Sequence, residues 1–113
     1  MGCNEATVRR LALSLPEAAE EPHHDMTSFR VRGKIFATVP PEGDRVHIFI
    51  ATDDVAAYCA EFPGLVDELL WGAKVRGCRL HLAAASATLA RELLVEAWRH
   101  RAPATLVARY DDL

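Results

Sequence analysis

The fold of this chain is decided by one stretch, His23-His24-Asp25-Met26-Thr27-Ser28-Phe29-Arg30-Val31-Arg32-Gly33-Lys34-Ile35-Phe36-Ala37-Thr38-Val39. Apolar and polar residues alternate on both sides of Gly33, which is typical of β-strands with one face in water. Gly33 tolerates the positive φ that a tight turn requires. The stretch therefore predicts a β-hairpin with strands over residues 27–32 and 34–39.

Further strands are expected after this hairpin. Turn-forming residues fill 40–44, and alternation resumes over residues 45–51 and again over 78–82. Residues 65–71 fit a short helix or a strand equally well, and residues 72–77 fit a loop or an edge segment. The clear alternating patterns therefore predict an antiparallel meander of three strands, followed by one later strand.

Helices are expected before, between and after the strands. Apolar residues recur with helical spacing after Asn4, after Thr52 and after Ser86, and each of these side chains can accept a hydrogen bond from a free backbone N–H at the helix start. A short tail helix is expected around Leu106. The order predicts an α+β fold with a twisted antiparallel sheet of four to five strands and helices packed on one face.

The composition is that of one folded domain. The chain has 113 residues, of which 50% are apolar and 26% charged, so we expect a single domain over residues 1–113. The three cysteines are scattered and no secretory signal precedes them, which predicts reduced thiols and a cytoplasmic protein. No apolar run approaches the ~20 residues of a membrane span, so no membrane role is expected.

Charge is unevenly distributed along the chain. The formal net charge is −3, but acids dominate as far as Glu68, whereas basic residues prevail over 69–110, where the acids are Glu92 and Glu96. The net charge disfavours a nucleic-acid binder, and the basic C-terminal part mildly favours one.

Three segments resemble the MmcQ/YjbR family. These segments are Leu15-Pro16-Glu17, then Ser28 to Ala37, and finally Glu96-Ala97-Trp98-Arg99 with Ala102-Pro103. The resemblance implies a CyaY-like α+β fold and a DNA-binding function, without established catalytic residues. Many members have an Asn-Lys-x-x-Trp segment that enters the last strand, whereas this chain has Lys74-Val75-Arg76-Gly77-Cys78 there.

Several basic side chains share the outward phase of the predicted strands. One uncovered sheet face would collect them, and Phe49 shares their phase, as does Phe36 if alternation continues through the turn. Cations can neutralise phosphates and exposed rings can stack on bases, so we predict a face that contacts DNA or another polyanion. The predicted nucleic-acid-binding residues are Arg30, Arg32, Lys34, His47, Lys74, Arg76, Arg79 and His81.

Two other interpretations remain open for this face. The first is a sheet face exposed to solvent, with no binding partner, whose charges only keep the protein soluble. Alternatively, the face and a groove near Trp71 serve a protein-interaction or small-ligand module, and pairing of the arginines with acids such as Glu20, Glu21 or Asp44 would favour that alternative. A free sheet edge would allow a homodimer.

No enzymatic, metal or cofactor site is predicted. His23-His24-Asp25 supplies ordinary metal ligands, but adjacent residues rarely converge on one ion. Cys78 has arginines nearby that would lower a thiol pKa, but no base partner is apparent. Trp98 lies on the apolar stripe of the last long helix and is expected in the core.

Overall fold

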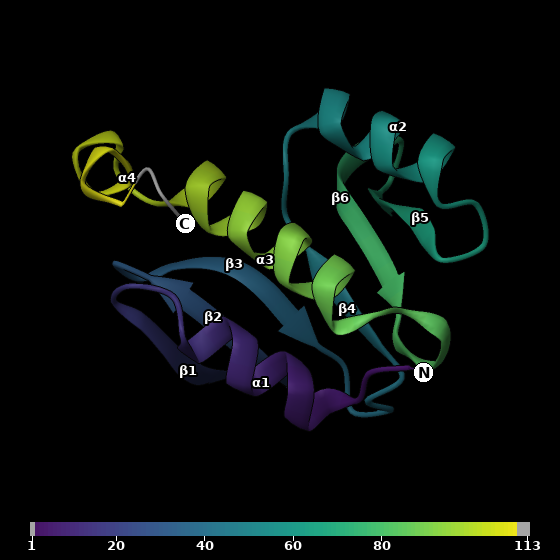
Figure 1. Ribbon diagram of the computed structural model, residues 1–113, viewed down its shortest axis with the longest axis horizontal. Helices are drawn as coiled ribbons and strands as arrows, with labels where there is room; N and C mark the ends of the chain where they lie inside the picture. The colour runs from purple at the N-terminus through teal and green to yellow at the C-terminus, as the bar shows by residue number, and fades with distance from the viewer. Residues whose placement is uncertain (1, 111–113) are drawn as a thin grey trace.

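A single six-stranded antiparallel sheet organises the fold in the computed structural model, which describes residues 2–110 (Figure 1). The strand order is β1-β2-β3-β4-β6-β5. In chain order the elements are α1 (Glu5–Leu13), β1 (Ala18–His23), β2 (Met26–Val31), β3 (Lys34–Val39), β4 (Arg45–Ile48), α2 (Thr52–Glu61), β5 (Val66–Trp71), β6 (Lys74–His81), a 3-10 turn (Leu82–Ala84), α3 (Ala87–Arg101) and α4 (Ala104–Arg109).

The expected hairpin is present, but the sheet has six strands and not four to five. β1 and β5 account for the difference, and they are the two edge strands. Most side chains of β1 face solvent on both sides, so its sequence shows no alternation, and Pro22 within it also argues against a strand. An edge strand pairs on one side only, which tolerates such a sequence.

Helices α1 and α3 lie across one face of the sheet (Figure 1). As predicted, Asn4 and Ser86 cap them: the Asn4 Oδ1 accepts from the N–H of Thr7, and the Ser86 Oγ accepts from that of Leu89. The predicted apolar stripe of α3 is buried. Its members are Leu89, Ala90, Leu93, Leu94, Ala97 and Trp98. At α2, by contrast, the predicted cap Thr52 is the first residue of the helix, and Ala51 before it provides no side-chain cap, so that prediction is wrong.

Trp98 joins α3 to the first corner of the chain. Its side chain is fully buried, and its Nε1 donates a hydrogen bond to the Pro16 carbonyl oxygen at 2.9 Å. A buried indole N–H needs such a partner. The contact therefore ties the last turns of α3 to the segment between α1 and β1.

Two β-bulges interrupt the alternation on which the sequence analysis relied. Between β2 and β3 the pairing jumps from Phe29↔Ala37 to Arg30↔Ile35, so Phe36 has no partner on β2. An extra residue on one strand shifts the phase of the side chains, and Phe36 and Ala37 are both fully buried. The prediction that Phe36 shares the outward face is therefore wrong.

The second bulge lies between β5 and β6. The pairing jumps from Leu69↔Gly77 to Leu70↔Val75, which leaves Arg76 as the extra residue. Gly77 follows it where β6 approaches β4 closely: a Cβ on Gly77 would lie 2.1 Å from the Ile48 carbonyl oxygen. Glycine is thus required here by close backbone approach.

No helix within residues 2–110 combines the length and the apolar character that crossing a membrane requires.

We predict that Trp98→Phe lowers the free energy of unfolding by about 1–3 kcal/mol, because it leaves a cavity and removes the donor to Pro16. Urea unfolding followed by circular dichroism measures this loss. The matched control is Trp71→Phe, since Trp71 is 61% exposed; its expected loss is below ~1 kcal/mol. Equal losses in the two variants would contradict the anchoring role of Trp98.

Candidate functional site

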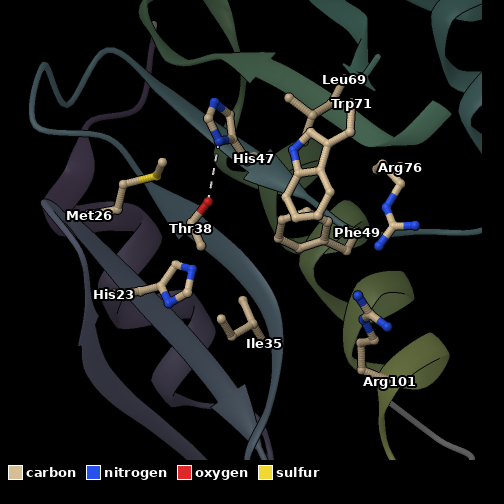
Figure 2. A pocket seen from close by; sticks show the side chains of 10 residues that line it. All are labelled: His23, Met26, Ile35, Thr38, His47, Phe49, Leu69, Trp71, Arg76 and Arg101. Carbon is tan, nitrogen blue, oxygen red and sulfur yellow. Dashed lines mark hydrogen bonds between the residues drawn. The ribbon is translucent and has the colours of Figure 1, made fainter. Parts of the chain in front are cut away.

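The sheet face opposite α1 holds a cavity of about 180 Å³ (Figure 2). Its wall is drawn from all six strands, from Phe49 just after β4, and from the last residue of α3. The lining residues are His23, Met26, Ile35, Thr38, His47, Phe49, Leu69, Trp71, Arg76 and Arg101. This set combines apolar and aromatic side chains with two arginines and two histidines, and it contains no carboxylate.

Each aromatic ring in the wall has an arginine beside it. The Arg76 guanidinium carbon lies over the Trp71 ring, 4.8 Å from its centroid, and that of Arg101 lies over the Phe49 ring at 5.7 Å. These are cation–π distances. Figure 2 shows both guanidinium groups on the Phe49 side of the cavity, while His23 and His47 lie across it. The cavity thus has an arginine end and a histidine end.

The bulge and the helix end explain where the arginines point. Arg76 is the unpaired residue of the β5–β6 bulge, and bulges re-aim side chains at functional sites. Arg101 follows the buried Trp98 by about one helical turn and ends α3. Its Nε is buried and has no hydrogen-bond partner among residues 2–110.

His47 is partly buried at the other end of the cavity. Its Nδ1 lies 3.3 Å from the Thr38 Oγ1, and it sits opposite Thr38 on β3 and Arg79 on β6. Burial, and then the charges of Arg45 and Arg79, lower the pKa of His47 below its ordinary value. The neutral imidazole is therefore favoured in the folded protein.

Acids pair with some of the predicted binding residues. The Arg32 guanidinium donates to both carboxylate oxygens of Glu17, at 2.6 and 3.0 Å, and this lowers the pKa of Glu17. Arg32 was expected at the end of a strand, but it lies in the turn after β2, with φ +51°. His81 Nε2 lies 2.5 Å from an Asp67 oxygen.

Arg30 lies on β2 with its Nε 3.1 Å from the Ser28 Oγ and 4.0 Å from a Glu21 oxygen. Arg45 lies two residues before His47 on β4, and its Nη1 is 2.8 Å from the Asp44 Oδ1. Together with the pairs of Arg32 and His81, these contacts interrupt the predicted basic face around its rim.

The remaining predicted residues have no ion pair with any acid in the part of the chain that the structure describes. Lys34 begins β3 and Lys74 begins β6, and both are exposed. Arg76 lines the cavity, and Arg79 lies between His47 and Asp67 in the sheet register. Of these four cations, Arg76 lines the cavity and Arg79 lies opposite His47, which also lines it.

Sequence reasoning missed Arg101 as a site residue. Nothing in a helical pattern indicates that a helix end reaches a sheet face, so the pattern does not reveal this role of Arg101. Ile35 and Met26 were missed as well, although the groove expected near Trp71 is present.

The weaker sequence motifs gain no support as sites. Residues 2–110 contain no group of three or more His, Cys, Asp and Glu side chains arranged to hold a metal ion. Cys78 is fully buried, and burial raises its pKa to about 12. The neighbouring arginines therefore do not activate this thiol at neutral pH.

Comparison with known proteins gives a family and a fold. The YjbR family model matches residues 13–100. A crystal structure of the Deinococcus radiodurans protein DR2400, described as a DUF419 domain, is similar with a TM-score of 0.69 and 17% identity, covering 94% of this chain and 79% of that one. None of the curated proteins matches the sequence. At this identity the structural likeness concerns the fold alone.

We predict that the pKa of His47 lies below about 6.5, its ordinary value, and that Arg79→Gln raises it, because one of the charges that lower it is removed. The NMR titration of the His47 ring carbons measures both values. Arg91→Gln, a change on the exposed side of α3, is the control and should leave the pKa unchanged.

The lowered pKa also sets the sign of a stability effect. At pH values between the lowered pKa of His47 and about 6.5, the unfolded chain binds more protons than the folded one. The stabilisation that neutral His47 gives the folded protein is therefore fully present above about pH 6.5, and it is lost as the pH falls through the lowered pKa. A His47 pKa above 6.5 would contradict both expectations.

Proposed function

This chain belongs to the YjbR family, and we propose that it is a binding module that takes a small organic anion in the cavity on its open sheet face. One observation carries the proposal: the ten lining residues place two arginines beside apolar and aromatic side chains without any acid. Small-ligand sites have this composition, with apolar walls and a few polar groups that fix orientation.

The size of the cavity limits the ligand. Drug-sized ligands occupy roughly 300–1,000 Å³, whereas an apolar cavity of about 150 Å³ accommodates benzene. The volume here is about 180 Å³, close to the second value. A ligand with one ring or a short chain fits, and any larger part must extend over the open sheet face.

The charge pattern supports a small anion over a long one. Glu17, Glu21, Asp44 and Asp67 lie beside the cations of the rim, and the formal net charge is −3. Acids at the rim repel a polyanion that extends past the cavity. They repel a single anionic group in the cavity much less, because screening in salt limits their range to about 10 Å.

Single-stranded DNA or RNA is the second candidate, and a specific observation favours it. Lys34, Lys74 and Arg79 have no acidic partner within residues 2–110, and Trp71, which pairs with Lys74 in the sheet, is 61% exposed. A strand could then place one base against Trp71 while neighbouring phosphates contact these cations.

We predict that phenyl phosphate binds the full chain and that Arg76→Gln with Arg101→Gln reduces its affinity at least tenfold, since both charges at the arginine end are lost. Isothermal titration calorimetry measures the affinity. The control of equal charge change is Arg10→Gln with Arg91→Gln, because both arginines are exposed and neither lines the cavity. Absence of binding to the unchanged protein, or equal binding by all variants, would refute the proposal.

The same titrations with oligo(dT) and oligo(U) of twelve nucleotides, at about 50 and 200 mM salt, distinguish a small-anion site from a nucleic-acid site. For a strand that contacts several phosphates, the logarithm of the affinity falls with the logarithm of the salt concentration with a slope near −0.7 per contact. We expect weak oligonucleotide binding with a slope no steeper than about −1.5, as for two contacts. A slope of −3 or steeper would contradict the small-anion proposal and favour single-stranded nucleic acid as the ligand.

A further inference from the structure

The arginine end of the cavity has two features that point to a ligand with several anionic oxygens. Arg76 and Arg101 come from different elements, a bulge and a helix end, and Figure 2 shows their guanidinium groups on the same side of the cavity. Neither has an acidic partner among residues 2–110, and the Nε of Arg101 is buried without a hydrogen bond. Two neighbouring cations of this kind are stabilised by an anion that accepts from both.

A phosphate group fits this end better than a carboxylate. The planar donor fork of each guanidinium binds two oxygens at once, so two forks can use more acceptors than the two oxygens of a carboxylate. A phosphate monoester offers three oxygens and nearly two negative charges at neutral pH.

The aromatic walls specify the rest of the ligand. Trp71 and Phe49 both line the cavity, and the guanidinium groups lie over their rings at 4.8 and 5.7 Å. Aromatic faces pack best against other flat rings, in stacked or edge-to-face contacts. At about 180 Å³ the cavity admits one such ring.

We infer that the ligand of this cavity is a single flat, unsaturated ring that carries a phosphate group. The ring lies against Trp71 and Phe49, and the phosphate binds Arg76 and Arg101. His47 and Thr38, across the cavity, face the far edge of the ring, where they can exchange hydrogen bonds with a polar ring substituent. This inference rests on the proposed function and narrows it to one class of organic anion.

Four probes test the ring and the phosphate separately by calorimetry on the full chain. Phenyl phosphate has both features, cyclohexyl phosphate lacks the flat ring, benzoate lacks the phosphate, and inorganic phosphate lacks any ring. We expect phenyl phosphate to bind at least tenfold more tightly than each of the other three. The fluorescence of Trp71 should change on binding, because Trp71 is 61% exposed and its ring contacts the ligand.

Trp71→Leu is the informative variant, because an exposed side chain can be replaced without loss of the core. It should bring the affinities of phenyl and cyclohexyl phosphate to within about twofold of each other. Leu70→Ala is the matched control: Leu70 is the exposed neighbour on β5, does not line the cavity, and should leave the tenfold preference unchanged.

The outcomes distinguish the inference from the proposed function. If cyclohexyl phosphate or benzoate binds as tightly as phenyl phosphate, the inferred ligand class is wrong while the anion site stands. If Trp71→Leu retains the full preference, the ring does not lie against Trp71 and the inference fails. If no probe binds the unchanged protein, the proposed function itself fails.

Discussion

The buried indole of Trp98 is the contact on which the rest of the structure depends. It fills the space between α3 and the sheet, and its hydrogen bond to Pro16 fixes the corner from which β1 departs. Arg101 follows Trp98 by about one helical turn and lies over the Phe49 ring, so the packing of Trp98 also helps to place one side of the cavity. One core contact thus sets the helix, the first edge strand and one side of the cavity.

The acids of the chain act on the site mainly by cancelling charge. Pairs such as Arg32–Glu17 are exposed on both partners, and pairs of this kind stabilise a fold by only about 0–1 kcal/mol. Their larger effect is electrostatic: they neutralise several cations of the open face, whereas Arg76 and Arg101 in the cavity have no acidic partner within residues 2–110. A strand order that brings Asp67 beside Arg79 and His81 produces this pattern, and it is not apparent from the net charge.

Local patterns predicted the regular parts of this fold and missed the parts that form the site. The hairpin at Gly33 and the caps at Asn4 and Ser86 follow from interactions within a few residues, so the sequence alone predicted them. The edge strand β1 could not be predicted, because its exposed residues carry no alternation and only pairing with β2 makes it a strand. Phe36 was misplaced for a related reason, since a bulge depends on the partner strand and not on the residue itself.

The second bulge falls where this sequence departs from the pattern of its family. The segment Lys74-Val75-Arg76-Gly77-Cys78 stands where the resemblance to the MmcQ/YjbR family leads one to expect Asn-Lys-x-x-Trp. In this chain the segment is the second bulge: it turns Arg76 into the cavity wall, and Gly77 lets β6 approach the Ile48 carbonyl. The segment that departs from the family pattern therefore contains Arg76, one of the two arginines at the arginine end of the cavity. Because the proposed anion site includes Arg76, we expect members that retain the Asn-Lys-x-x-Trp pattern to present a different cavity wall at the same place.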